Sequence, residues 1–102
     1  MLEALASMVA FINTITTHGS VVTYATGSLF IRLVITRPGD FRSVYGFVAA
    51  QDGRNKKLGA FKAGDVFYGD GWKGPAKNVR GTVFDAARYS LFLNEHAVGT
   101  LR

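Results

Sequence analysis

The sequence has only two prolines, no cysteine, and no lysine or arginine before Arg32. The last two absences each exclude a class of protein. A chain without cysteine forms no disulfide, thiolate metal site or cysteine nucleophile, and we expect a cytoplasmic location. The apolar-leaning stretch from Leu2 to Ile15 is interrupted by polar residues and is too short to span a bilayer. It also lacks the positive start of a signal peptide. We therefore expect no membrane association.

The composition is that of an ordinary globular domain. The chain has 102 residues, of which 48% are hydrophobic and 19% charged, a balance unlike that of disordered chains. Its 12 glycines suit tight turns between strands, because glycine reaches positive φ at little steric cost. We predict one domain over 1–102, with a helix at about 2–17 and a β-rich part at 20–102. The predicted fold class is α+β, with an N-terminal amphipathic helix packed on a five- to six-stranded, mostly antiparallel sheet.

Apolar residues recur at helical spacing near the N-terminus. They are Leu2, Leu5, Met8, Val9, Ile12 and Ile15. Spacings of three and four place them on one face, which predicts a helix that packs on the sheet. His18 and Gly19 are the predicted stop, with Gly19 as the residue after the cap.

After Gly19 the period changes to two, which predicts strands at 21–24, 29–36, 44–49, 57–62 and 65–68. In 29–36 both alternating sets are fairly apolar, so we place this strand near the centre of the sheet. Residues 51–55 are predicted to be a loop of hairpin length. An antiparallel sheet of this size has edges, and edge pairing to a homodimer is open.

Two segments are less regular. Residues 69–81 are rich in glycine and contain the only tryptophan, and we predict a structured loop with one helical turn starting at Pro75. Residues 83–93 could form a helix capped by Thr82 or Asp85. We favour a hairpin instead, in which 89–93 turns at 94–96 into 97–101.

Positive charge is concentrated in the middle of the chain. Residues 32–82 carry ten bases and four acids, whereas the whole chain has a net charge of +5. Such a field attracts nucleic acid, acidic proteins or anionic membranes. The alternative is an ordinary soluble surface, since this net charge is normal for a small domain.

Tyr45-Gly46-Phe47-Val48 resembles the centre of the RNP1 motif of RNA-recognition-motif domains, and cold-shock domains carry a similar strand. In those families the aromatic side chains stack on bases at an exposed sheet face. The flanking residues Ser43, Val44 and Ala50 depart from the motif, so we assign neither family. We predict instead that Tyr45 and Phe47 face the core of the sheet.

A cluster of basic and aromatic residues is the sharper candidate site. Bases pair with phosphates, and aromatic faces stack on nucleobases. The candidate nucleic-acid-binding or partner-binding residues are Tyr68, Trp72, Lys73, Lys77 and Arg80, extended by Arg54, Lys56 and Lys57. The alternative places Trp72 as a core plug under the loop, with the lysines merely solvated.

The sequence offers little for catalysis. Gly69 to Gly74 matches G-x-G-x-x-G, but no helix of useful length follows, so a dinucleotide site is not predicted. His18 and His96 are far apart and isolated, which is typical of structural histidines. Asp65, Asp70 and Asp85 have no metal-loop spacing. We expect no catalytic residue, no metal and no cofactor.

These observations favour a non-enzymatic binding module that contacts nucleic acid with little sequence specificity, since no recognition helix is evident. The alternative is a protein-binding inhibitor or adaptor of phage or plasmid type, for example an inhibitor of a CRISPR complex, with an acidic or nucleic-acid-associated partner. A continuous positive groove would favour the first hypothesis, and an exposed apolar patch would favour the second.

Overall fold

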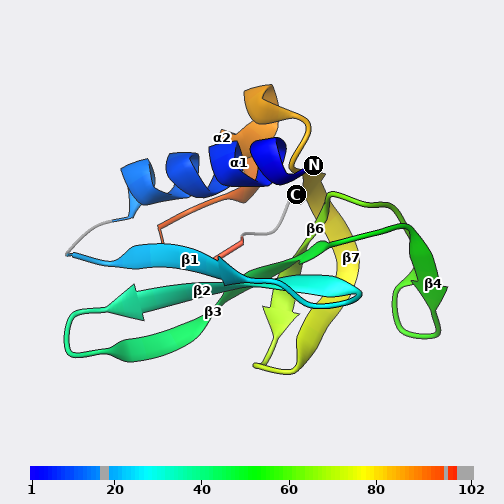
Figure 1. Ribbon diagram of the computed structural model, residues 1–102, viewed down its shortest axis with the longest axis horizontal. Helices are drawn as coiled ribbons and strands as arrows, with labels where there is room; N and C mark the ends of the chain where they lie inside the picture. Colours follow the sequence, from blue (N-terminus) through cyan, green and yellow to red (C-terminus); the bar gives the residue numbers. More distant parts are fainter. Residues whose placement is uncertain (17–18, 96, 99–102) are drawn as a thin grey trace.

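One helix packs on a twisted antiparallel sheet in the computed structural model, which describes residues 1–16, 19–95 and 97–98 (Figure 1). The elements in chain order are α1 (Leu2–Ile15), β1 (Val21–Ala25), β2 (Phe30–Arg37), β3 (Phe41–Ala49), β4 (Gly53–Asn55), β5 (Gly59–Phe61), β6 (Asp65–Asp70), β7 (Gly74–Thr82), the 3₁₀ helix η1 (Ala86–Arg88) and α2 (Tyr89–Phe92). The main sheet has the order β1-β2-β3-β6-β7, and β4 pairs only with β5. This confirms the predicted α+β class.

The helix α1 forms where the apolar spacing predicts it. Leu5, Met8 and Ile12 are fully buried, and their spacing places them on the face that covers the sheet. The helix ends at Ile15, earlier than the predicted stop, because Thr16 already has an extended backbone. Gly19 has a φ of 76° and belongs to the turn before β1 instead of capping the helix. His18 lies outside the described residues.

Strand β2 pairs with β1 on one side and β3 on the other, as the predicted central position requires. Ile31, Leu33 and Ile35 are buried on the helix side of the sheet. The alternate residues, among them Arg32 and Val34, are half-buried on the opposite side. The period of two in the sequence therefore separates the two faces of the sheet correctly.

Strand β3 contains a bulge that turns the side chain of Tyr45 into the core beneath α1. Leu33 pairs with Gly46 and Val34 with Val44, so Tyr45 is the extra residue. Tyr45 is fully buried, and its hydroxyl donates to the carbonyl of Asn94 at 2.5 Å. Burial raises the pKa of this hydroxyl far above its ordinary value. Phe47 is buried in the core of the opposite face, so the prediction that both aromatic residues face cores is confirmed.

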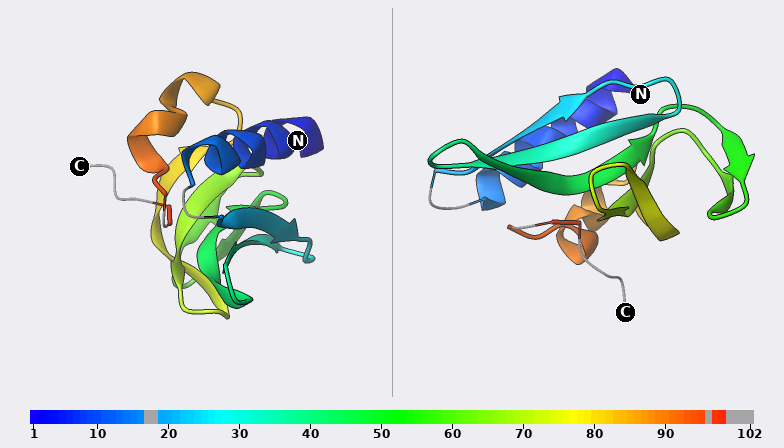
Figure 2. Two further views of the ribbon diagram at one scale, coloured as in Figure 1. Left: turned by 90° about the vertical axis from the view of Figure 1, so that its left-hand side faces the viewer. Right: turned by 90° about the horizontal axis from the view of Figure 1, so that it is seen from below.

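The sheet separates two apolar cores of different size. The larger lies under α1 and the C-terminal segment (Figure 2) and contains buried residues from α1 to Val98. The smaller lies on the opposite face, where the β4–β5 hairpin covers part of the sheet. It consists of Phe47, Ala49, Phe61 and Phe67, with Phe30, Val44 and Leu58 packed against it.

The predictions of a loop at 51–55 and a strand at 57–62 are wrong in their bounds. Residues 53–55 form strand β4, and only Gly59–Phe61 of the predicted strand is extended and pairs with β4 in a separate hairpin. Strand β6 takes the place beside β3 in the main sheet. The β4–β5 hairpin folds over the sheet because Phe61 is buried in the smaller aromatic core, on the face of the sheet opposite α1.

The C-terminal hairpin predicted over 89–101 is wrong in its first strand, because residues 89–92 form the short helix α2. The predicted reversal of the chain is present, since Leu93 and Val98 make an isolated antiparallel bridge. Tyr89 and Phe92 are three residues apart and both buried, while Leu91 is exposed, which is a helical pattern. The hydroxyl of Tyr89 donates to the carbonyl of Val83 and holds the helix on the core. His96 and 99–101 lie outside the described residues.

Candidate nucleic-acid interface

The glycine-rich segment 69–81 forms a β-hairpin, so the predicted loop with a helical turn at Pro75 is wrong. Residues 74–82 are strand β7, which pairs with β6 along its length. Two register shifts and the positive φ of Asn78, 80°, interrupt the alternation that would have revealed this strand. The β6–β7 turn, residues 71–73, projects on the side of the sheet away from α1 (Figures 1 and 2).

Trp72 in this turn is held against the sheet by Arg32 of β2. The guanidinium carbon of Arg32 lies 4.8 Å from the centroid of the Trp72 ring and 5.9 Å from that of Phe47. The Arg32 Nε donates to the Trp72 carbonyl at 3.0 Å. The guanidinium stacks a cation on the Trp72 indole, and the hydrogen bond to the Trp72 carbonyl fixes the turn. Trp72 still has 47% of its surface exposed, so it is not a core plug.

Trp72 separates two hollows on this face. The larger, about 370 Å³, is lined by Ser43, Val44, Tyr68, Gly69, Gly71 and Trp72. The other, about 200 Å³, is lined by Thr23, Tyr24, Ala25, Arg32, Val34, Thr36, Arg42 and Trp72. We call these lining residues together the Trp72 face. Gly69 of β6 lets this strand lie close to Val44 of β3, since a Cβ at position 69 would overlap the Val44 side chain.

The Trp72 face combines one exposed indole ring with two arginines. Trp72 is 47% exposed, whereas Tyr24 pairs with Leu33 and Tyr68 follows Phe67, so strand alternation turns both tyrosine rings toward the helix side of the sheet. Arg32 and Arg42 line it, and none of the acidic residues that the structure describes does. Hydroxyl groups of Thr23 and Thr36 lie on the same side of the sheet as Arg32, since Thr23 pairs with Val34 and Thr36 with Arg42. The arrangement therefore offers cations for an anionic group, a ring for stacking and hydroxyls for hydrogen bonds.

The two hairpins on this side are tied by an ion pair. The Nζ of Lys57, at the tip of the β4–β5 hairpin, lies 2.5 Å from the Oδ2 of Asp70 at the end of β6. Both side chains are at least half exposed, so the pair contributes about 0–1 kcal/mol to stability. The pair nevertheless places the basic tip, with Arg54 and Lys56 exposed on it, beside the β6–β7 turn.

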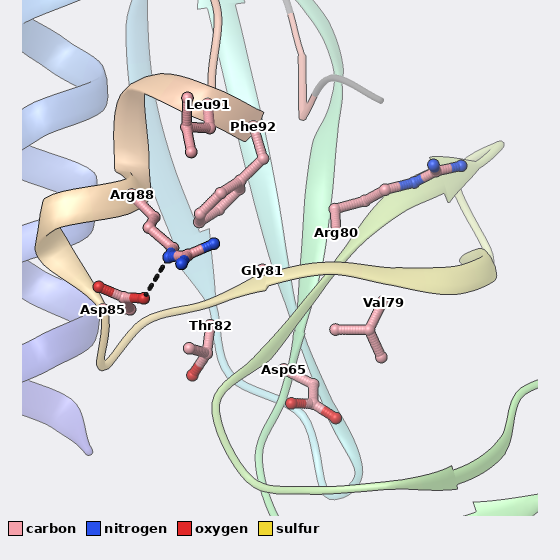
Figure 3. A pocket seen from close by; sticks show the side chains of 9 residues that line it. All are labelled: Asp65, Val79, Arg80, Gly81, Thr82, Asp85, Arg88, Leu91 and Phe92. Atoms are coloured by element: carbon pink, nitrogen blue, oxygen red, sulfur yellow. Dashed lines mark ion pairs between the residues drawn. The ribbon is translucent and has the colours of Figure 1, made fainter. Parts of the chain in front are cut away.

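The structure distributes the other predicted site residues over several surfaces. Tyr68 and Trp72 line the same hollow, and Lys73 is exposed in the turn next to Trp72. Lys77 is exposed on β7. Arg80 is half-buried and lines a different hollow, between β7 and α2 (Figure 3). The eight predicted residues therefore do not form one surface.

The sequence prediction missed both arginines of the Trp72 face, Arg32 and Arg42. Arg32 had a usable signal, because it alternates with the buried Ile31 and Leu33 and so belongs to the opposite face. What brings it to Trp72 is the return of the chain 40 residues later, which no local pattern predicts.

No three His, Asp or Glu side chains cluster closely enough to hold a metal ion in the part of the chain that the structure describes. No helix within the same residues is long and apolar enough to cross a membrane. A comparison of the chain with family models, with curated proteins and with solved structures finds no match in any of the three.

Proposed function

We propose that the protein is a non-enzymatic module that binds single-stranded nucleic acid on the Trp72 face, with little sequence specificity. The observation that carries this proposal is the lining of two adjoining hollows by Arg32, Arg42 and the exposed Trp72, with no acidic residue among their described lining residues. Backbone phosphates would contact Arg32 and Arg42, and a base would stack on the exposed indole of Trp72.

The geometry favours single strands over duplexes. Bases stack on a protein ring only when they are unpaired, whereas sequence readout of a duplex usually places a helix or a β-ribbon in the major groove. Both α1 and α2 lie on the opposite side of the sheet from the β6–β7 turn (Figures 1 and 2). A sheet face with stacking rings accepts any base, because every base has a π-face.

Trp72 is prepared for such stacking by Arg32. The guanidinium occupies one face of the indole and hydrogen-bonds the backbone of the turn, which fixes the ring before a ligand arrives. A side chain that is already ordered loses less conformational entropy on binding. Base–aromatic stacking contributes about 1–3 kcal/mol for each base.

The test is fluorescence anisotropy of labelled single-stranded and duplex DNA and RNA, at low and physiological salt. Trp72→Leu should weaken single-strand binding at least about fivefold, in line with the loss of one stacked base. Arg42→Ala should weaken it and reduce the salt slope by about 0.7, the contribution of one phosphate contact to a single strand.

Arg54→Ala is the matched control, since Arg54 is also an exposed arginine on a strand but lines neither hollow. It should change affinity less than Arg42→Ala. A flat titration of the unaltered protein at low salt would contradict the proposal, and a protein partner would then become the better explanation of this face.

A further inference from the structure

The smaller hollow of the Trp72 face lies between two arginines. Its volume is about 200 Å³, and Arg32 and Arg42 both line it. Pockets for drug-sized molecules usually have about 300–1,000 Å³, so this hollow is too small for a whole molecule of that kind. A water molecule occupies about 30 Å³ in the liquid. The hollow therefore has room for a compact group such as a phosphate, together with a few waters.

The strand register places the two arginines at opposite ends of this hollow. Thr36 of β2 pairs with Arg42, and Arg32 lies four residues before Thr36 on the same face. At about 3.3 Å per residue, the two arginine positions are about 13 Å apart along the strands. Half-buried Val34 lies between them and also lines the hollow. Two long side chains at this spacing can contact one anionic group from both sides.

Neither arginine is neutralised by the protein. No ion pair among the described residues includes Arg32 or Arg42. Arg32 uses its Nε for the carbonyl of Trp72, at 3.0 Å, and its two Nη groups have no partner in the described part of the chain. Arg42 is exposed, and its guanidinium likewise has no described partner. Both groups are therefore available to an anion.

Two hydroxyl groups add further donors to the same hollow. Thr23 pairs with Val34 and Thr36 pairs with Arg42, so both threonines lie on the arginine side of the sheet. Neither hydroxyl has a partner among the residues that the structure describes. Arginine binds phosphate through two parallel charge-assisted hydrogen bonds. The set of donors thus fits an anion that has several oxygens.

This set matches a terminal phosphate better than an internal one. An internal phosphodiester of a strand carries one negative charge and has two oxygens outside the chain. A terminal phosphate monoester carries about −1.5 to −2 charges at pH 7 and has three free oxygens. Two arginines and two hydroxyl groups around one small hollow can satisfy the larger charge and the third oxygen together.

We propose that this hollow binds the terminal phosphate of a single strand and so directs the protein to strand ends. The inference rests on the proposed function, because the base of the same nucleotide stacks on Trp72. Arg32 covers one face of the Trp72 indole, and the terminal base takes the exposed face. Since Trp72 also lines the hollow, the phosphate and the base contact adjoining parts of one site.

The test is a competition experiment that follows the fluorescence anisotropy of a labelled single strand with hydroxyl groups at both ends. The unlabelled competitors have the same sequence and carry a 5′-phosphate, a 3′-phosphate or no terminal phosphate. At least one phosphorylated strand should bind at least about tenfold more tightly than the hydroxyl-ended strand, and it identifies the end that occupies the hollow. A hydroxyl-ended strand one nucleotide longer controls for the added charge and should show no comparable gain.

Arg42→Ala should remove most of the preference for the terminal phosphate, measured as the ratio of the two affinities. Arg37→Ala is the matched control, since Arg37 follows Thr36 on β2 but its Nη1 donates to the Oγ of Ser43 at 2.6 Å, on the helix side of the sheet. This variant loses the same charge and should keep the preference. Thr36→Val should reduce the preference by a smaller factor than Arg42→Ala, because it removes one hydroxyl at nearly constant volume.

Equal binding of phosphorylated and hydroxyl-ended strands would overturn this inference and leave the proposed function standing, whereas no binding of any strand would overturn both. A preference that Arg42→Ala and Arg37→Ala reduce equally would also overturn it, because the preference would then reflect net charge alone. Inorganic phosphate should displace the phosphorylated strand only at a far higher concentration than a second phosphorylated strand does. If it displaces the strand equally well, the hollow binds free phosphate and the assignment to strand ends is wrong.

Discussion

The two faces of the main sheet differ in how completely they are covered, and this difference separates stability from binding. The helix face is closed by α1 and the C-terminal segment, and its core residues are almost entirely inaccessible. The other face is covered by the β4–β5 hairpin over one part only. The remaining part keeps Arg32, Arg42 and Trp72 at its surface. A half-covered face has room for a ligand that a closed core lacks.

The largest expected effect compares neighbouring residues of β2 that point to opposite faces. Leu33→Ala removes a fully buried side chain from the helix-face core and should lower the free energy of unfolding by about 2–5 kcal/mol. Val34→Ala, on the half-covered face, should cost about 1 kcal/mol or less because its site is partly open to water. Urea unfolding followed by circular dichroism measures both, and equal losses would contradict the contrast.

A smaller effect concerns the one buried hydroxyl at the bulge of β3. Tyr45→Phe should cost about 1 kcal/mol at neutral pH, because the carbonyl of Asn94 loses its donor. The pKa of Tyr45 is raised in the folded state, since burial disfavours the phenolate. The unfolded chain then loses the proton at about pH 10 while the folded chain keeps it.

The contribution of Tyr45 is therefore fully present below about pH 10 and declines by about 1.4 kcal/mol per pH unit above it. Unfolding curves of the unaltered protein and of Tyr45→Phe between pH 7 and pH 11 measure this decline as the difference between the two proteins. A difference that stays constant across this range would show that the hydroxyl does not resist ionisation.

The smallest effect concerns the open face itself. Arg32→Lys keeps the positive charge but loses the planar group over Trp72, and we expect a loss of about 0.5–1 kcal/mol of stability. The emission of Trp72 should move to longer wavelength as water reaches the freed side of the indole. Arg54→Lys, in the separate hairpin, should change neither quantity. An unchanged emission spectrum in Arg32→Lys would contradict the stacked arrangement.

Local patterns predicted the elements whose residues alternate or recur without interruption. The helix over 2–15 and the strand over 30–37 follow directly from spacing, and so does the placement of Arg32 on the face opposite Leu33. Such patterns report which side of an element is apolar, and burial of that side is the main favourable contribution to folding. Trp72 was a candidate from composition, because it stands in a glycine-rich basic segment, and its role in binding stays a prediction.

Tertiary structure decided the rest, where contacts distant in sequence override local preference. Strand β7 is interrupted by two register shifts, and the pairing with β6 supplies the extended conformation that its glycines do not favour. The short α2 is held by Tyr89 and Phe92 packing on a core built by the first half of the chain. The stacking of Arg32 on Trp72 exists only once the strands have taken their order in the sheet. The sequence by itself determined which residues are apolar, basic or aromatic and how they alternate, whereas the folded chain alone decided which of them meet.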